Sequence, residues 1–411
     1  MTSVSGSNIL VTGGVTKETY DSVRHIRNSS RSENHGHKVA IELAKQGAKV
    51  TLVTAKTHVA KPDGVIVVDS KKDGSKIVST TDLKDAIDEQ LLSTWFDTVV
   101  NLAVTPSVKP AEIRKEKVKR DKKSGKPESI AVRGNTDLLN HIPEKTGATQ
   151  IIGYDRKQNL KTVRGDSDLE SLITEQNTGE RVTIGETIPS RSLGRQPLDG
   201  KRILITSGRT EEQITQSGDV ITNFASGRQG HAIAQAFADM GANVVLVTGP
   251  TYLPDPDDEK IQTIHINSST ELRDTCLEQI PADAAVCVCA VADFGLDEKL
   301  DLNLSESEKR DLVLNQMPDT LKTIGTHDTK RPTVVIGFAA ETNNLINYAK
   351  GKLNSKGANA IVANDVGAAM VKRNRTQNQV FFETPDGVEP MDEMSKYDVG
   401  LQIGEKIAGL L

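Results

Sequence analysis

The chain of 411 residues lacks several features that mark special classes of protein. Aromatic residues make up only 3% of it, so its cores must be built from Val, Ile, Leu and Ala, which suits parallel sheets covered by helices. Its three cysteines are too few for a disulfide framework and match no zinc spacing. It has neither the roughly 20-residue apolar run of a membrane helix nor, at its start, the pattern of a signal peptide. These absences predict a cytoplasmic protein without a membrane partner.

An excess of charge of one sign is also missing. Lys and Arg number 51 against 56 Asp and Glu, which gives a net charge of −5 and argues against a protein that coats nucleic acid. Hydrophobic residues at 36% and charged residues at 26% are typical of a globular chain, and the length predicts two or three domains.

One stretch, 109–126, concentrates positive charge, with nine Lys or Arg against three acids. It contains Pro, Gly and Ser, which favour a mobile loop. Such a loop could neutralise a triphosphate as a lid, or it could be a plain solvated loop. A nucleic-acid patch is disfavoured because no aromatic side chains are interleaved.

The strongest signal is an internal repeat. SNILVTGGVTKE begins at Ser7 and KRILITSGRTEE begins at Lys201. The same offset of 194 residues aligns Gly36-His37 with Gly230-His231 and LVT at 52–54 with LVT at 246–248. We interpret the chain as a duplicated domain, in which residues 1–160 are a degenerate first copy, 161–198 a polar linker and 199–411 a more complete second copy.

Each copy is expected to begin with a strand (9–12 and 203–206), a glycine turn, a helix (37–46 and 231–240) and a second strand. Strands alternate with helices throughout, which predicts α/β domains with doubly wound parallel sheets. Further strands are expected at 64–68, 97–104, 149–153, 261–265, 284–291, 333–338, 359–363 and 378–382, and helices near 81–92, 135–141, 269–279, 318–325, 344–356 and 393–409.

Three segments of the second copy could carry chemistry. Asn223 lies in a loop of small and polar residues, 221–231, just before a helix, which suits an anion or an ordinary helix cap. Asp293 follows an apolar strand, where parallel sheets bind ligands, and it could serve a ribose, a metal or a helix cap. The first copy has Pro106 at the position aligned with Asp293. Lys352 and Lys356 share a helix face, which is typical of an anion site or of a solvated surface.

These motifs resemble the phosphopantothenoylcysteine synthetase (phosphopantothenate–cysteine ligase) family. The second copy shows them in the family's order over most of 200–370: GKRILITSGRTEEQI, ITNFASGRQG, AVADF, NQMPDTL, GFAAET, AKGKLNSKGAN and IVANDV. The first copy resembles the family through ILVTGGVTKETYDSVRHIRN and through the lysine-rich EKVKRDKKSGKPESIAVRGNTDLL.

The resemblance implies Rossmann-like domains paired as an internal pseudo-dimer, with further oligomerisation left open. It implies activation of 4′-phosphopantothenate by CTP or ATP with Mg²⁺, followed by transfer of the acyl group to the amine of cysteine. The sequence does not distinguish CTP from ATP. Lysines must offset the repulsion between a carboxylate and a polyphosphate, and an amide must steady the acyl intermediate.

The resemblance also assigns residues. Asn223 matches the asparagine that serves the acyl-nucleotide, Lys117 and Lys119 match a catalytic lysine flap, and the metal ligands are not assigned. The remaining matches, all to the nucleotide site, are Asp293, Lys299, Pro318, Asp319, Thr320, Leu321, Phe338, Ala339, Ala340, Glu341, Lys352 and Lys356.

Each copy departs from the family where the other keeps the pattern. The second copy has Asp301 and Leu302 in place of later flap lysines, and the first copy lacks the aspartate and the GFAAET strand end. We therefore expect one complete site, with the flap of the first copy acting on a nucleotide held by the second. A ligase for another acid and amine and a catalytically inactive nucleotide-binding protein stay open as alternatives. A nicotinamide oxidoreductase is disfavoured because the glycine fingerprint is missing.

Overall fold

The computed structural model describes residues 4–30, 32–57, 59–115, 128–148, 150–155, 158–164, 169–177, 187–341, 353–365 and 377–411. The chain forms two compact units, which are not continuous stretches of sequence. The first unit comprises Met1–Ile184 together with Gln213–Thr222 and Phe294–Asn315, and the second comprises the remainder. Two segments of the second copy thus fold as part of the first unit.

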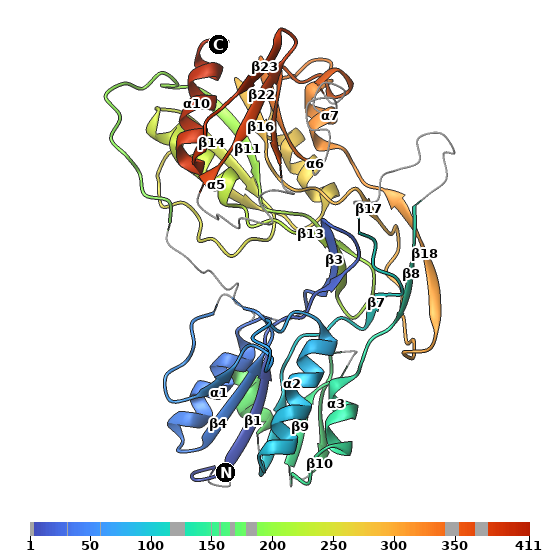
Figure 1. Ribbon diagram of the computed structural model, residues 1–411. Helices are drawn as coiled ribbons and strands as arrows, with labels where there is room; N and C mark the ends of the chain where they lie inside the picture. The colour runs from blue at the N-terminus through green and yellow to red at the C-terminus, as the bar shows by residue number, and fades with distance from the viewer. Residues whose placement is uncertain are drawn as a thin grey trace. The chain divides into compact units, whose positions relative to one another are not determined.

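The first unit contains a six-stranded sheet in the order β10-β9-β6-β1-β4-β5 (Figure 1). β1 pairs in parallel with β4 and with β6, so that Ile9 lies opposite both Val50 and Thr98. The edge strand β10 is antiparallel to β9. The strands are β1 (Asn8–Gly13), β4 (Lys49–Thr54), β5 (Ile66–Val68), β6 (Thr98–Asn101), β9 (Gln150–Tyr154) and β10 (Leu160–Arg164).

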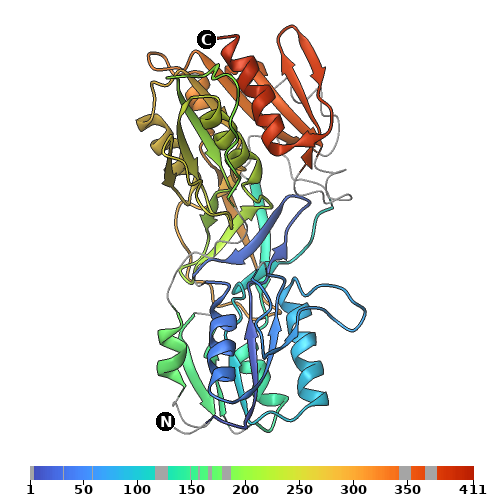
Figure 2. The same ribbon diagram turned by 90° about the vertical axis from the view of Figure 1, so that its left-hand side faces the viewer.

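Helices cover both faces of this sheet (Figure 2). Val39 and Leu43 of α1 and Ile173 of α4 pack on one face, and Leu83 of α2 and Leu138 of α3 pack on the other. The helices are α1 (His35–Lys45), α2 (Thr80–Ser93), α3 (Leu138–His141), the 3₁₀ turn η1 (Ile142–Glu144) and α4 (Glu170–Glu175).

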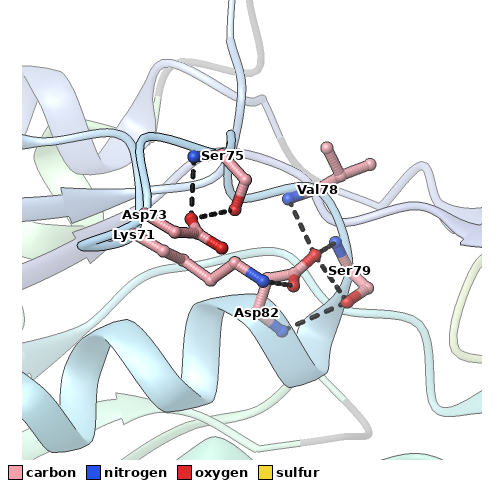
Figure 3. A network of polar contacts seen from close by, with 6 residues as sticks. All are labelled: Lys71, Asp73, Ser75, Val78, Ser79 and Asp82. Atoms are coloured by element: carbon pink, nitrogen blue, oxygen red, sulfur yellow. Dashed lines mark hydrogen bonds and ion pairs between the residues drawn. The ribbon is translucent and has the colours of Figure 1, made fainter.

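A polar network fixes the start of α2 (Figure 3). Ser79 Oγ accepts from the Asp82 amide at 3.1 Å, and Asp82 accepts in return from the Ser79 amide at 3.0 Å, which forms a capping box. Lys71 donates to the same carboxylate at 2.8 Å. Partial burial alone would raise the pKa of Asp82, but the bonds from Lys71 and Ser79 hold it below its usual value. The helix that covers the first sheet therefore begins at a defined residue.

The second unit contains an eight-stranded sheet in the order β15-β14-β11-β16-β19-β20-β22-β23. The strands β15, β14, β11, β16, β19 and β20 are all parallel to one another. The hairpin of β22 and β23 that follows them in the sheet is antiparallel. The strands are β11 (Arg202–Ser207), β14 (Asn243–Thr248), β15 (Ile261–His265), β16 (Ala284–Cys287), β19 (Val334–Glu341), β20 (Ala360–Asp365), β22 (Val380–Thr384) and β23 (Gly387–Pro390); β21 (Gln377–Asn378) and β24 (Met394–Ser395) pair separately.

The helices of the second unit also lie on both faces of its sheet (Figure 1). α5 (Arg228–Asp239) and α10 (Lys396–Ala408) share one apolar cluster, and α6 (Ser269–Glu278) and α7 (Thr320–Gly325) share the other. A glycine is required at position 230 because a Cβ there would lie 2.4 Å from Ser207 Oγ. Gly36 has the same role in the first copy, where a Cβ would lie 2.7 Å from the Gly13 Cα.

Two four-stranded sheets join strands from both copies. Their orders are β12-β13-β3-β2 and β17-β18-β8-β7, so each is built from equivalent hairpins in a twofold-like arrangement. Between them lies a cluster of buried apolar side chains that includes Ile26, Ile130, Ile221 and Leu312. The strands are β2 (Glu18–Thr19), β3 (Arg24–Asn28), β7 (Val108–Pro110), β8 (Glu128–Gly134), β12 (Glu211–Gln213), β13 (Asp219–Asn223), β17 (Phe294–Gly295) and β18 (Lys309–Gln316).

The predicted fold class is confirmed: both units have mainly parallel sheets with helices on both faces. Two local expectations differ from the structure. The range 161–198, interpreted as a linker with room for one short helix, does contain one short helix, α4, but it also contains most of strand β10, which that interpretation does not predict. The segment expected as a loop from 221 begins as a strand, because Ile221–Asn223 complete β13. The expected helix at 344–356 lies mostly outside the described residues.

Candidate functional site at the strand ends of the second copy

The carboxyl ends of β11, β16 and β19 form one edge of the second sheet. β14 lies on one side of β11 and β16 on the other, so the strand order reverses at β11. In doubly wound sheets ligands bind outside the carboxyl ends of the strands at such a reversal. The site is therefore expected at the segments that follow these strands.

Asn223 is held at this edge through its side-chain amide. As the last residue of β13 it belongs to the second unit, and its Nδ2 donates to the Val291 carbonyl at 2.8 Å. Its Oδ1 is buried, and the described residues supply no hydrogen-bond partner for it. A buried acceptor without a partner costs about 1–3 kcal/mol. The amide is thus fixed on one side and has unused hydrogen-bonding capacity on the other.

Asp293 lies two residues beyond the carbonyl that holds Asn223. Its side chain is exposed, and its own carbonyl accepts from the Met317 amide at 3.0 Å. This bond attaches the turn that precedes α7 to the end of the β16 segment. Pro318 and Asp319 are part of that turn, and Asp319 caps α7 by accepting from the Lys322 amide at 3.0 Å.

Lys356 donates to the Asp319 carboxylate, so the two form an ion pair at the start of α7. Lys356 is expected to bind a phosphate. In this structure its ammonium group already pairs with a carboxylate, so a phosphate would have to compete with Asp319 for it. Thr320, the next residue, is buried, and its Oγ1 has no partner among the described residues.

The end of β19 packs directly against α7. Ala339 is buried, Phe338 is half-buried, and a Cβ at Gly337 would lie 2.4 Å from the Leu321 side chain. The structure thus brings together nine of the assigned positions within the second unit: Asn223, Asp293, Pro318, Asp319, Thr320, Leu321, Phe338, Ala339 and Lys356.

The other assigned residues are not part of this described cluster. Lys299 is exposed in the segment between β17 and β18, which belongs to the first unit. Lys117, Lys119 and Lys352 lie outside the described residues, as do the side chains of Ala340 and Glu341. Their roles stay predictions.

Sequence reasoning missed Arg209, a buried cation at the end of β11. Its guanidinium pairs with Glu211 at 3.1 Å and donates to the Ala225 carbonyl at 3.2 Å. The loop between β13 and α5, in which Ala225 lies, is thereby attached to the first strand of the sheet. The only sequence signal is that the first copy has Val15 at the equivalent position.

The same edge of the first copy corrects the alignment of Asp293 with Pro106. Thr12 Oγ1 accepts from the amides of residues 102 and 103, and its counterpart Thr206 Oγ1 accepts from those of residues 288 and 289. Counting onward, Asp293 is equivalent to Ser107. The one-residue difference arises because the letters favour pairing LAV at 102–104 with CAV at 289–291, whereas the bonds to Thr12 and Thr206 set a register shifted by one residue.

Ser107 and Asn28 of the first copy hold the carboxylate of Asp219, and all three residues belong to the first unit. Asn28 Nδ2 donates to Asp219 Oδ1 at 2.7 Å. The Ser107 amide and hydroxyl donate to Oδ2 at 2.9 and 2.5 Å. Asn28 ends β3 as Asn223 ends β13, so the asparagine of the first copy already has a carboxylate bound to it.

Burial raises the pKa of Asp219 from 3.8 to about 6, although the bonds from Ser107 and Asn28 act in the opposite direction. A folded-state pKa above the unfolded value contributes stability that is complete below the unfolded pKa and is lost as the pH rises through the folded pKa.

We therefore expect the free energy of unfolding of the wild type to fall by about 1 kcal/mol, relative to Asp219→Asn, between about pH 5 and about pH 7.5. Urea titrations of both proteins at the two pH values measure this difference. Parallel pH profiles for the two proteins would show that Asp219 titrates normally.

The described residues offer neither a metal cage nor a reactive thiol. They contain no group of three or more His, Cys, Asp or Glu side chains that could hold a metal ion. Burial raises the pKa of all three thiols, that of Cys287 to about 12, so none is a candidate nucleophile.

A membrane-spanning helix is likewise absent from the part of the chain that the structure describes, where no helix is both long and apolar enough.

Comparison with known families identifies both copies. The family described as "DNA/pantothenate metabolism flavoprotein C-terminal domain" matches residues 4–169 and again residues 198–410. The chain therefore belongs to this family and carries its domain twice, as the internal repeat predicts.

Similar curated proteins carry the name "Coenzyme A biosynthesis bifunctional protein CoaBC". The chain is 36% identical to that of Vibrio parahaemolyticus over 218 residues, 52% of this chain and 54% of that protein. It is 35% identical to that of Bacillus subtilis over 217 residues, 52% of each. For that of Vibrio cholerae the identity is 34% over 293 residues, 65% of this chain and 72% of that protein. The chain thus spans about half the length of the first two.

Among solved structures, the C-terminal domain of a CoaBC protein is 34% identical, with a TM-score of 0.43, and the match covers 52% of this chain and 97% of that one. A structure of a Cab2 mutant in complex with phosphopantothenate-cysteine is 15% identical, with a TM-score of 0.42, and the match covers 51% of this chain and 88% of that one.

Proposed function

We propose that the protein is a phosphopantothenate–cysteine ligase of coenzyme A biosynthesis. The observation that carries the proposal is the Asn223 amide at the strand ends of a family domain, whose Nδ2 is fixed by the Val291 carbonyl and carries a second hydrogen for the acid. The family match and the motifs around the site support the same reaction. A cytoplasmic location remains a prediction.

The proposed reaction has two steps. The carboxylate of 4′-phosphopantothenate attacks the α-phosphate of CTP or ATP, which forms an acyl-nucleotide and releases pyrophosphate. The amine of cysteine then attacks the acyl carbon, forms the amide bond and releases the nucleoside monophosphate. The first step brings anions together, so fixed donors and cations must offset their repulsion.

The proposal assigns a separate role to each of several described residues. In the proposed reaction the Asn223 amide donates to the acid in both steps through the second Nδ2 hydrogen, the first being bonded to the Val291 carbonyl. The start of α7, capped by Asp319 and attached to Asp293 through Met317, forms the nucleotide side of the site. Lys356 can exchange its bond to Asp319 for one to a phosphate oxygen when a nucleotide binds. Mg²⁺ enters with the nucleotide, whose phosphates supply its ligands.

The proposal is tested by incubating the protein with 4′-phosphopantothenate, cysteine, Mg²⁺ and either CTP or ATP, with pyrophosphate and the amide product measured. We expect continuous formation of both products, in equal amounts, only when all components are present; without cysteine at most one pyrophosphate per site should be released. Continuous pyrophosphate release without phosphopantothenate or without cysteine would indicate other substrates. Nucleotide binding without any release would indicate a non-catalytic homologue.

A separate expectation concerns Lys356. Replacement by Ala removes a cation at the start of α7 and should weaken nucleotide binding about 10- to 100-fold, because a charge-assisted hydrogen bond contributes about 1.5–3 kcal/mol. Titration calorimetry measures the affinity. Lys322→Ala is the matched control, since Lys322 is an exposed lysine on α7 with no side-chain bond among the described residues. Equal affinities for both variants and the wild type would leave Lys356 as a structural partner of Asp319.

A further inference from the structure

We propose that the first copy keeps a carboxylate-binding pocket at its strand ends, and that the side chain of Asp219 fills this pocket as a permanent internal ligand. The proposal rests on the proposed function in one respect, the equivalence of this pocket to the acid site of the second copy. Its physical content, a pocket selective for a carboxylate, stands on the contacts in the first unit alone.

The first argument is position. Asn28 ends β3 as Asn223 ends β13, and Ser107 occupies the place of Asp293. The two donors therefore come from the segments that form the candidate site in the second copy. The carboxylate that they hold comes from β13 of the second copy, about 190 residues away in sequence.

The second argument is the completeness of the contacts. Asn28 and Asp219 are fully buried and Ser107 is 5% exposed. One hydrogen of the Asn28 amide binds Asp219 and the other binds the Ser217 carbonyl at 2.9 Å, while Oδ1 accepts from Ser30. The amide is thus oriented so that only an acceptor fits in front of it.

The third argument is the nature of the donors. Among the described residues no Lys, Arg or His bonds to Asp219; its oxygens accept from one side-chain amide, one hydroxyl and one backbone N–H, and the Thr215 hydroxyl acts on it in the same direction. Neutral donors alone around one carboxylate form an anion-binding pocket rather than an ion pair. Such a pocket recognises the planar carboxylate through hydrogen-bond geometry.

The arrangement is not reciprocal. The residue of the first copy equivalent to Asp219 is Arg24, which forms a two-bond pair with Asp21 at 2.7 and 3.0 Å. Its guanidinium also lies over the rings of Tyr20 and Phe294, at 5.3 and 5.4 Å. The contacts named here for Arg24 are all with residues of the first unit, so Arg24 does not act as an internal ligand in the way that Asp219 does. One pocket of the duplicated pair is filled by the chain itself, so each chain is expected to bind one molecule of acid substrate.

The test removes the internal ligand and supplies a small one. Asp219→Ala deletes a group the size of formate and leaves the donors of Asn28 and Ser107 unpaired. We expect its melting temperature to lie below that of the wild type, and to rise by about 3 °C more than that of the wild type when about 0.5 M sodium formate replaces sodium chloride. Sodium nitrate, planar but not a carboxylate, should give a smaller rise.

Ile221→Ala is the matched control, because Ile221 is a buried apolar residue on the same strand and its cavity offers no donors. It should respond to formate no more than the wild type does. If Asp219→Ala does not fold in sodium chloride, the yield of folded protein after refolding in sodium formate is measured instead. A folded yield in formate supports the proposed carboxylate-binding pocket.

Equal responses of Asp219→Ala, Ile221→Ala and the wild type to formate, or failure of Asp219→Ala to fold in either salt while the control folds, would overturn the proposal. Neither measurement uses a nucleotide or phosphopantothenate, so a failure here is distinguishable from a failure of the ligase assay.

Discussion

Asn223→Asp is expected to lower the rate of amide formation by about 100- to 1,000-fold, the usual cost of losing a fixed donor to a developing negative charge. The variant loses both amide hydrogens, so it cannot donate to the Val291 carbonyl or to the acid substrate. It also introduces a carboxylate beside the Val291 carbonyl, and its charge opposes the negative charge that develops on the acyl oxygen when cysteine attacks. Formation of the acyl-nucleotide, measured as a pyrophosphate burst in single turnover, should be affected less than its transfer to cysteine.

The control for this prediction is Asn243→Asp, which makes the same chemical change at an exposed position of the same unit. Its rate should equal that of the wild type. Asn28→Asp is unsuitable as a control, because it would place a second carboxylate 2.7 Å from Asp219 and destabilise the first unit directly. If Asn223→Asp forms product at the rate of Asn243→Asp, the Asn223 amide does not touch the reacting groups.

The repeat and the two large sheets could be predicted because their signals are local and periodic. Val, Leu and Ile of β1 and β11 recur at one offset, and Gly36 and Gly230 recur because a helix approaches a strand too closely for a Cβ. Such constraints act within a few residues or between neighbouring elements. A sequence pattern therefore expresses them directly.

The joined sheets could not be predicted, because their signals are short and their partners are distant. β18 buries only Leu312 and Leu314 of its eight residues, which resembles a solvated loop when it is read alone. These leucines are buried because β8 pairs beside them, with Leu312 opposite Ile130. The burial of Asp219 could not be predicted for the same reason. An acidic residue in a short strand indicates an exposed position unless its hydrogen-bond donors, here distant in sequence, are known.

The expected effect on folding is largest for the isolated second copy, 199–411. Two of its segments, 213–222 and 294–315, belong to the first unit. Six of its side chains are buried in the cluster between the joined sheets: Ile214, Ile221, Phe294, Leu302, Leu312 and Leu314. Exposing them costs on the order of 10 kcal/mol, comparable to the whole stability of a typical domain. The fragment is therefore expected to be partly unfolded and inactive.

Pairing of the fragment with itself would not restore the missing contacts. Where the first copy offers the Ser107 amide and hydroxyl to Asp219, a second copy of 199–411 would present Asp293, so two carboxylates would meet in a buried place. Fragment 1–198 supplies the correct donors, and mixing the two fragments should restore a folded one-to-one complex with part of the ligase activity. Circular dichroism and light scattering on each fragment and on the mixture measure this outcome. A stable and fully active dimer of 199–411 alone would contradict this prediction. It would show that neither the Ser107 donors to Asp219 nor the flap lysines of the first copy are needed.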